Sequence, residues 1–261
     1  MRHGLDEYAH LYSPVHDWEP RCKLIALMVL IFAFTVVQHP YLLLPMLGVT
    51  AVLYGVSNLP LSFLLSRLHY PGYFLLGVTV LLPFVSGQTV VAQLGGLNVY
   101  REGVLAAVTI ASRFISMVMV ALVLFGSSPI VTTIKAMRSL GLPKTLADMT
   151  LLFYRYLYEM GDNLMRMQTA MRLRGFRMRR PSRRNLKVLA ALAGSLLIRS
   201  YEQSERVYSA MRLRGYGSEI KASRTDWQVR PRDVAGVAIV LLVAAGLVGA
   251  QMVLEQSDLQ V

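Results

Sequence analysis

Residues 24–66 read LIALMVLIFAFTVVQHPYLLLPMLGVTAVLYGVSNLPLSFLLS and contain no charged side chain. A helix needs about 20 residues to cross the hydrocarbon of a bilayer, so this run is too long for one membrane span. Gln38-His39-Pro40 divides the run, because a proline disfavours helix at the residue before it. The run therefore predicts membrane helices at residues 20–38 and 41–57, with Asp17 as the N-cap of the first.

Uncharged runs recur further along the chain. Residues 68–100 carry no charged side chain, and neither do residues 234–254. The further predicted spans are 72–94, which opens after Pro71-Gly72, then 103–126 and 234–254. Arg113 lies near the middle of the 103–126 span, and a charge at that depth is a functional candidate. We expect Arg113 to have a structural role or to contact another membrane subunit.

The composition of the whole chain agrees with a membrane protein. Of its 261 residues, 54% are hydrophobic and 16% are charged, whereas a soluble domain has about 25% charged residues. Cys22 is the single cysteine, which excludes an intrachain disulfide. Residues 1–23 carry charges of both signs, so we expect a retained first span rather than a cleaved signal peptide. The predicted fold is an all-α polytopic membrane protein with about five transmembrane helices.

The positive charge is concentrated in one segment before the last predicted span. Residues 127–232 hold 21 of the 27 Lys and Arg residues and 7 of the 15 Asp and Glu residues. Basic residues favour the cytoplasmic side of a membrane, so this segment is predicted to be cytoplasmic. The chain then divides into a cytoplasmic segment at 1–23, four spans within 24–126, a basic cytoplasmic domain at 127–232, and a last span with an external tail at 233–261.

The basic domain is itself predicted to be helical. A short helix at 130–140 ends at Gly141-Leu142-Pro143, and two long helices follow at 145–174 and 184–214. In the first long helix, apolar residues recur alternately every four and three positions, which predicts a packed face. These residues are Phe153, Leu157, Met160, Leu164, Met167 and Met171.

A repeated motif closes both long helices. Ala170-Met171-Arg172-Leu173-Arg174-Gly175 recurs 40 residues later as Ala210-Met211-Arg212-Leu213-Arg214-Gly215, and an aromatic residue follows each copy. A glycine after a helix and an arginine in its last turn are ordinary C-terminal features, and this explains one copy well. Capping does not require the Ala-Met-x-Leu part of the motif. The two copies therefore predict two equivalent contacts with a partner that has two equivalent sockets.

The motif resembles the paired Ala-Arg-Gly signatures of the transmembrane coupling component of energy-coupling factor transporters. The stretch from Tyr154-Arg155-Tyr156 to Gly175 is similar to the cobalt-type branch, the CbiQ family. The N-terminal pieces Leu5-Asp6-Glu7-Tyr8-Ala9 and Pro20-Arg21-Cys22-Lys23 are similar as well. Leu173 and Leu213 stand where the signature has alanine, whereas its arginine and glycine are present in both copies.

The resemblance implies a non-catalytic subunit that works with several partners. Arg174, Gly175, Arg214 and Gly215, with Ala170, Arg172, Ala210 and Arg212, would contact two ATPase subunits. The long helices would pass the closure of those ATPases to a substrate-binding membrane subunit, with room for a small accessory membrane subunit. The substrate implied is a transition-metal ion, cobalt before nickel, bound by another subunit. We expect no cofactor and no metal site in this chain.

Three alternatives remain open from the sequence. The first is a coupling component for a vitamin. The second is a membrane-anchored protein that binds nucleic acid or lipid through the basic run at residues 177–184. The third is a membrane enzyme, but the chain has no G-x-x-x-x-G-K-[ST] phosphate loop and no candidate nucleophile. We favour the coupling role and expect no nucleic-acid partner.

Overall fold

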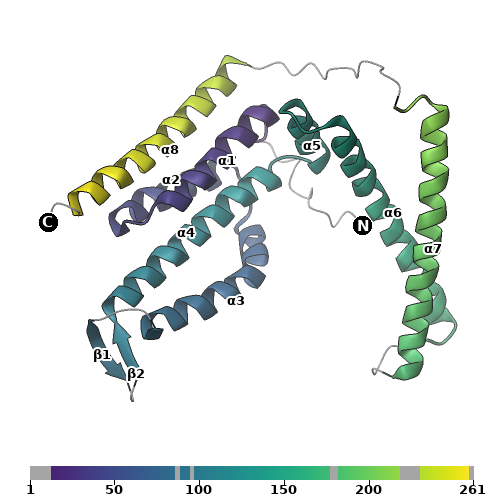
Figure 1. Cartoon of the computed structure of the whole chain (residues 1–261), viewed down its shortest axis with the longest axis horizontal. Coiled ribbons are helices and arrows are strands. Elements are labelled where there is room, and N and C mark those ends of the chain that lie inside the picture. The colour runs from purple at the N-terminus through teal and green to yellow at the C-terminus, as the bar shows by residue number, and fades with distance from the viewer. Residues whose placement is uncertain (1–12, 86–88, 95–96, 177–181, 218–229, 259–261) are drawn as a thin grey trace. The chain divides into compact units, whose positions relative to one another are not determined.

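The computed structural model describes residues 13–85, 89–94, 97–176, 182–217 and 230–258. The chain forms two compact units. The first unit combines Met1–Leu142 with Trp227–Val261, and the second is Pro143–Asp226. Figure 1 shows the elements, which we describe for each unit separately.

The first unit is built from helices with one small hairpin. Its elements are α1 (Pro20–Val36), the 3-10 helix η1 (Pro40–Leu42), α2 (Leu43–Val56), α3 (Leu61–Val85), strands β1 (Val90–Leu94) and β2 (Leu97–Tyr100), α4 (Arg101–Gly126), α5 (Ile130–Ser139) and α8 (Pro231–Asp258). The prediction of an all-α membrane fold is confirmed, with the antiparallel pair β1–β2 as an addition.

Within the part of the chain that the structure describes, three helices are long and apolar enough to cross a membrane. They lie at Leu61–Val85, Arg101–Gly126 and Pro231–Gln256, and an apolar stretch at Pro40–Val56 is shorter. Helix α1 has 17 residues, and α2 has 14. The two spans predicted from residues 24–66 are thus present as helices that are shorter than the other three.

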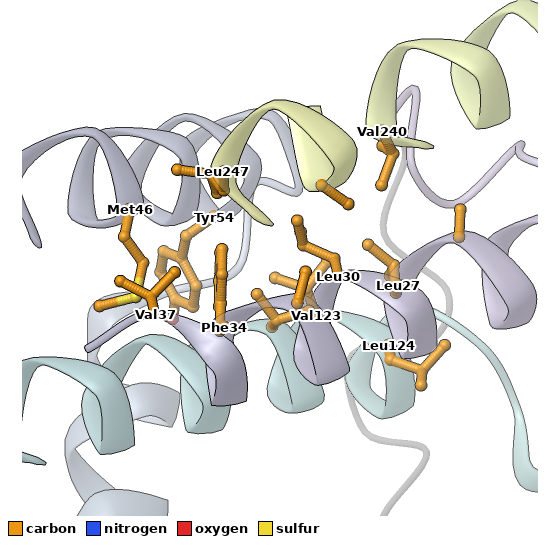
Figure 2. Close-up of a cluster of buried hydrophobic side chains, with 14 of the residues drawn as sticks. Leu27, Leu30, Phe34, Val37, Met46, Tyr54, Val123, Leu124, Val240 and Leu247 are labelled. Atoms are coloured by element: carbon orange, nitrogen blue, oxygen red, sulfur yellow. The ribbon is translucent and has the colours of Figure 1, made fainter. Parts of the chain in front are cut away.

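Helix α1 lies in the centre of the first unit. Its neighbours are α8 and α4 along its length and α5 near its start. Leu27, Leu30 and Phe34 of α1 are completely buried, and Figure 2 shows them among side chains from the neighbouring helices. The other labelled members of this core are Val37, Met46, Tyr54, Val123, Leu124, Val240 and Leu247. Close van der Waals packing of this kind is what holds helices together in a lipid environment.

Helices α1 and α8 run in the same direction. At their starts, the indole N–H of Trp18 donates to the carbonyl of Asp233 at 3.1 Å. At their far ends, the side-chain oxygen of Gln251 accepts from the backbone N–H groups of Gln38 and His39, both at 3.0 Å. The two helices therefore have their starts together at one end of the first unit and their far ends together at the other.

Helix α4 runs antiparallel to α1. The Lys23 ammonium near the start of α1 donates to the carbonyl of Ser127, which follows the end of α4, at 3.2 Å. Arg113, half-way along α4, donates to the carbonyl of Val37 at the end of α1. The start of α1, the end of α4 and the start of α8 therefore lie at the same end of the first unit.

Both limits predicted for the 72–94 span are wrong, since residues Val90–Leu94 form strand β1, and so is the N-cap predicted for the first span. Helix α3 begins at Leu61 and runs through Pro71, although we expected a span to open after Pro71-Gly72. A proline removes one backbone hydrogen bond, which membrane helices tolerate when other groups compensate. The N-cap of α1 is Glu19, whose carboxylate accepts from the N–H of Cys22 at 3.1 Å, and not Asp17.

The second unit contains two long antiparallel helices. Helix α6 spans Lys144–Leu173 and α7 spans Arg183–Leu213, close to the predicted ranges. The Tyr216 hydroxyl donates to the carboxylate of Asp148 at 3.4 Å, and the Gln203 amide donates to that of Glu159 at 2.8 Å. The end of α7 thus lies beside the start of α6.

The packed face predicted for α6 is only partly covered. Phe153 is 66% exposed and Leu157 is 53% exposed, whereas Met160, Leu164, Met167 and Met171 are half-buried. An apolar face that the unit itself does not cover is typical of a surface that meets another protein or a lipid phase.

Candidate functional site

The two copies of the repeated motif form the same structure at the ends of α6 and α7. We call residues 170–176 the α6 tip and residues 210–216 the α7 tip. In the α6 tip, Gly175 N–H donates to the carbonyl of Arg172 at 3.0 Å, and Phe176 N–H to that of Met171 at 3.0 Å. In the α7 tip, the equivalent bonds are Gly215 to Arg212 at 3.0 Å and Tyr216 to Met211 at 2.9 Å.

These paired bonds define a Schellman motif, in which a glycine just past the helix adopts a left-handed conformation. Gly175 has φ +84° and Gly215 has φ +78°. Glycine adopts this conformation without the steric cost that a Cβ atom imposes. The motif also fixes the direction of the backbone after the helix. Arg174 and Arg214 therefore have the same backbone geometry around them at the two tips.

The tips expose the same residues. Leu173 is 85% exposed and Leu213 is 91% exposed. Arg172, Arg174, Arg212 and Arg214 are exposed, as are Ala170 and Ala210, whereas Met171 and Met211 are half-buried. Two leucines almost fully in solvent have no role in helix capping. Each tip therefore offers an apolar leucine between two arginines, and guanidinium groups suit planar contacts with carboxylates or carbonyl oxygens.

The structure keeps the two tips apart. Asp148 lies beside Tyr216 of the α7 tip, and it precedes Arg174 by 26 residues on α6. At 1.5 Å per residue, the tips are separated by roughly 40 Å of helix. The eight predicted residues therefore form two sites at opposite ends of one antiparallel pair, rather than one shared pocket.

The surroundings of the two tips differ in one respect. The guanidinium carbon of Arg212 lies 5.9 Å from the ring centroid of Tyr208 on the preceding turn, within the range of a cation–π contact. The equivalent position before the α6 tip is Gln168, which has no ring. The side chain of Arg212 is thus partly oriented by Tyr208, whereas the equivalent Arg172 has no such ring one turn before it. Arg174 and Arg214 are therefore the better matched pair of arginines.

Arg113 has a contact inside the first unit. Its guanidinium donates to the carbonyl of Val37, one of the groups that the end of α1 leaves without a helical partner. It also lines an open pocket of about 440 Å³ together with Gln38 and Glu102. The contact with Val37 suits the first of the two predicted roles of Arg113, a structural one, and that role stays a prediction.

Sequence reasoning missed the burial of several polar residues of the first unit, among them Lys23, Gln251 and Asp233. Lys23 is 1% exposed, Gln251 is 4% exposed and Asp233 is 7% exposed. Lys23 and Asp233 stand at the edges of apolar runs, where a charge normally marks the membrane boundary. Neither position in the sequence therefore indicated that the side chain is buried. The single polar residue near the end of the last apolar run, Gln251, was the one visible hint.

Two segments with a predicted role or similarity lie wholly or largely outside the described residues. The basic run at 177–184 falls largely on residues 177–181, and the N-terminal similarity at Leu5-Asp6-Glu7-Tyr8-Ala9 falls on residues 1–12.

Comparison with known proteins places the chain in a family. The model of the CbiQ family, described as cobalt transport protein, matches residues 12–226, which include both tips. The chain belongs to the CbiQ family. This CbiQ-family chain is 23% identical to an energy-coupling factor transporter transmembrane protein, EcfT, of Staphylococcus aureus, over 92% of the chain and 94% of that protein.

Two further relatives of this CbiQ-family chain are similar over most of their length. It is 25% identical to the EcfT protein of Bacillus subtilis, over 92% of the chain and 95% of the relative. It is 24% identical to an uncharacterized protein of Methanocaldococcus jannaschii, over 93% and 85% respectively. The names of the EcfT relatives specify energy coupling and a transmembrane location, and they name no substrate.

Proposed function

We propose that this chain is the transmembrane coupling subunit of an energy-coupling factor importer. Its task is to receive the motion of ATPase subunits at the α6 and α7 tips and to pass it to a substrate-binding membrane subunit. The observation that carries the proposal is the pair of tips with the same cap geometry, the same exposed leucine and the same exposed arginines. The chain itself is a non-catalytic subunit.

The partner at the tips is a pair of ATPase subunits, each of which receives one tip. The proposal is supported by the separation of roughly 40 Å along the helices, which is too large for one small groove and suits two neighbouring subunits. Arg174 and Arg214 would each enter a groove lined with carboxylate or carbonyl oxygens. The exposed leucine would fill an apolar part of the same groove.

The transmission step relies on the stiffness of α6 and α7. A helix with a full set of internal hydrogen bonds does not shorten, so a displacement at one tip moves the whole helix. Nucleotide binding would bias the ATPase pair between two states, and the helices would carry that difference to the membrane part. The incompletely covered apolar face of α6, with Phe153 and Leu157, is the surface that we assign to the substrate-binding subunit.

The substrate proposed is a transition-metal ion, cobalt before nickel, held by the substrate-binding subunit. The description of the matched family supports this choice. A vitamin is the second candidate, because the EcfT relatives are named without a substrate. We place the complex in the cell membrane, with the N-terminus and the basic domain in the cytoplasm. The shared position of the starts of α1 and α8 and the end of α4 supports this topology.

The decisive experiment is the double variant Arg174→Ala/Arg214→Ala in the complete complex. Each arginine should contribute about 2 kcal/mol through charge-assisted hydrogen bonds, so losing both should weaken ATPase binding about a thousandfold. The measurement is the amount of ATPase that copurifies with the tagged chain, together with uptake of radioactive cobalt. The matched control is Arg166→Ala/Arg206→Ala, which removes two exposed arginines with the same 40-residue offset.

Membrane insertion should be unchanged in both variants. Normal copurification and uptake in the Arg174→Ala/Arg214→Ala variant would refute the role of the tips. Retained binding that falls steeply as salt is raised, with nucleic acid rather than an ATPase in the purified material, would support the nucleic-acid alternative instead.

A further inference from the structure

A cluster of buried polar groups lies at the end of the first unit where α1 and α8 start and α4 ends. We call this cluster the junction, and it consists of Val15, Trp18, Glu19, Lys23, Ser127 and Asp233. All of its polar members except Trp18 are less than 9% exposed. The chain leaves the first unit after Leu142, past Ser127, and returns to it at Trp227, shortly before Asp233. Helix α5 separates Ser127 from the outgoing connection, and Asp233 follows the return of the chain by six residues.

Lys23 joins three segments within the junction. Its ammonium donates to the carbonyl of Val15 at 3.2 Å, to the carbonyl of Ser127 at 3.2 Å and to the Ser127 hydroxyl at 3.0 Å. An ammonium group has three protons, so these three acceptors match its capacity. Lys23 therefore ties the segment before α1 and the turn between α4 and α5 to α1 itself.

Asp233 makes the corresponding connection at the start of α8. Its carboxylate accepts from the N–H of Glu19 at 3.4 Å and from the N–H of Arg230 at 3.0 Å. Its carbonyl accepts from the indole of Trp18. A Cβ atom on Gly236 would lie 3.1 Å from the Trp18 ring, so the indole packs directly on the backbone of α8.

The cost of burying these groups argues for a specific role. A buried ammonium loses its hydration, and packed apolar residues often replace buried charges without loss of stability. A methionine could fill the space of the Lys23 stem. What an apolar side chain cannot do is fix the Ser127 turn and the Val15 segment in one defined position relative to α1.

We propose that the junction is the site at which motion of the second unit enters the membrane helices, with Lys23, Trp18 and Asp233 as positioning residues. This inference rests on the proposed coupling function. A displacement of the second unit reaches the first unit through the two chain connections. A displacement of the outgoing connection reaches the Ser127 turn through α5, and Lys23 passes it from that turn to α1. A displacement of the returning connection reaches the start of α8, and Asp233 passes it to α1 through its contacts with Trp18 and Glu19.

The chain contains its own reporter for this motion. Cys22 is its single cysteine, it is half-buried, and it stands beside Lys23 on α1. The Cys22 side chain interacts with Glu19 and Asp233 of the junction, so a rearrangement of the junction changes the surroundings of the thiol and the rate at which N-ethylmaleimide alkylates it. The experiment measures this rate by peptide mass spectrometry in the complete complex, without nucleotide and with ATP and vanadate, and it requires no knowledge of the transported substrate.

In the unaltered complex the alkylation rate should differ between the two nucleotide states. Lys23→Met should abolish that difference while the ATPase remains bound and active. Lys135→Met is the control, because Lys135 is an exposed lysine on α5 that has no place in the junction. If Lys23→Met does not insert, Ser127→Ala and Trp18→Phe each remove one hydrogen bond and should reduce the difference.

Equal alkylation rates in both nucleotide states of the unaltered complex would overturn the inference. An undiminished difference in Lys23→Met would overturn it too, as would undiminished differences in both Ser127→Ala and Trp18→Phe. These outcomes are distinct from failure of the coupling function itself, in which no ATPase copurifies or the Arg174→Ala/Arg214→Ala variant retains it.

Discussion

At the scale of single residues, the two tip glycines are the clearest link between sequence and site. Both stand one position after an arginine, and both have the left-handed backbone that the Schellman motif requires. No heavy atom beyond its chain neighbours lies within 4 Å of a Cβ placed on Gly175, so the requirement at this position is conformational and not one of space.

Because the requirement at Gly175 is conformational, replacing glycine with alanine should have opposite effects at two positions, one at the α6 tip and one inside α6. Gly175→Ala should destabilise the α6 tip by about 1 kcal/mol, because alanine disfavours a left-handed backbone. Gly161→Ala should stabilise α6 by about 1 kcal/mol, because Gly161 lies inside the helix with no heavy atom within 4 Å of its Cβ position. Amide hydrogen exchange in the last turn of α6 measures the first effect, with an expected increase of about fivefold. Slower exchange after Gly175→Ala would contradict the tip geometry.

Residue-level prediction from sequence worked where the cause is local. A glycine after an arginine-rich last turn specifies its own conformation, so the tips were predictable. The burial of Lys23 was not, because the acceptor that holds it, Ser127, is 104 residues away in the chain. A lysine beside an apolar run has the same local sequence whether it marks a membrane boundary or fills a buried site.

At the scale of elements, the turn between α1 and α2 shows how a polar backbone is accommodated among apolar helices. The N–H groups of Gln38 and His39 both donate to the side chain of Gln251, and the carbonyl of Val37 accepts from Arg113. Backbone groups outside regular helix need such partners when they lie near the hydrocarbon. Side chains from α8 and α4 therefore complete the end of α1.

Gln251→Leu should reduce the stability of the first unit by about 1–3 kcal/mol, because it leaves two backbone donors without their acceptor. The measurement is the midpoint of thermal unfolding in detergent. The matched control is Gln256→Leu, five residues later on α8, where the side chain is exposed and the effect should be small. Equal midpoints for the two variants would show that the Gln251 contacts carry no stability.

Helix existence was predictable from the sequence, and some helix boundaries were not. Among the described residues, the uncharged runs overlap the three helices that are long and apolar enough to cross a membrane, as well as the shorter α1 and α2, because length and apolar composition are properties of the run itself. The third span was expected to open after Pro71-Gly72, but Pro71 lies inside α3. The hairpin β1–β2 was overlooked, although two short strand-like runs, Val90–Leu94 and Leu97–Tyr100, flank Gly95-Gly96 and together are a hairpin signal. The long apolar context favoured a helix over this weaker pattern.

At the scale of the whole molecule, the orientation of the chain in the membrane follows from helix directions and charge. The start of α1, the end of α4 and the start of α8 share one end of the first unit, and the basic second unit follows α5 and precedes α8 in the chain. Basic segments favour the cytoplasmic side, so this end is proposed to face the cytoplasm.

Single-cysteine variants in a Cys22→Ser background test this orientation on intact cells. A membrane-impermeant maleimide should label Glu255→Cys, which lies near the end of α8, without opening the cells. It should label Arg199→Cys, which is exposed on α7, only after the membrane has been opened. The reversed pattern would place the tips outside and remove their access to ATP-dependent partners.

The small lengths of α1 and α2 have a consequence for the surrounding lipid. At 1.5 Å per residue, the 17 and 14 residues of these helices correspond to about 26 Å and 21 Å, against roughly 30 Å of hydrocarbon. Acyl chains that border α1 and α2 meet the polar turn between these two helices before they reach the level at which the longer neighbouring helices end. The adjoining leaflet must therefore thin locally or admit water there, and either adjustment costs less in a bilayer of shorter lipids.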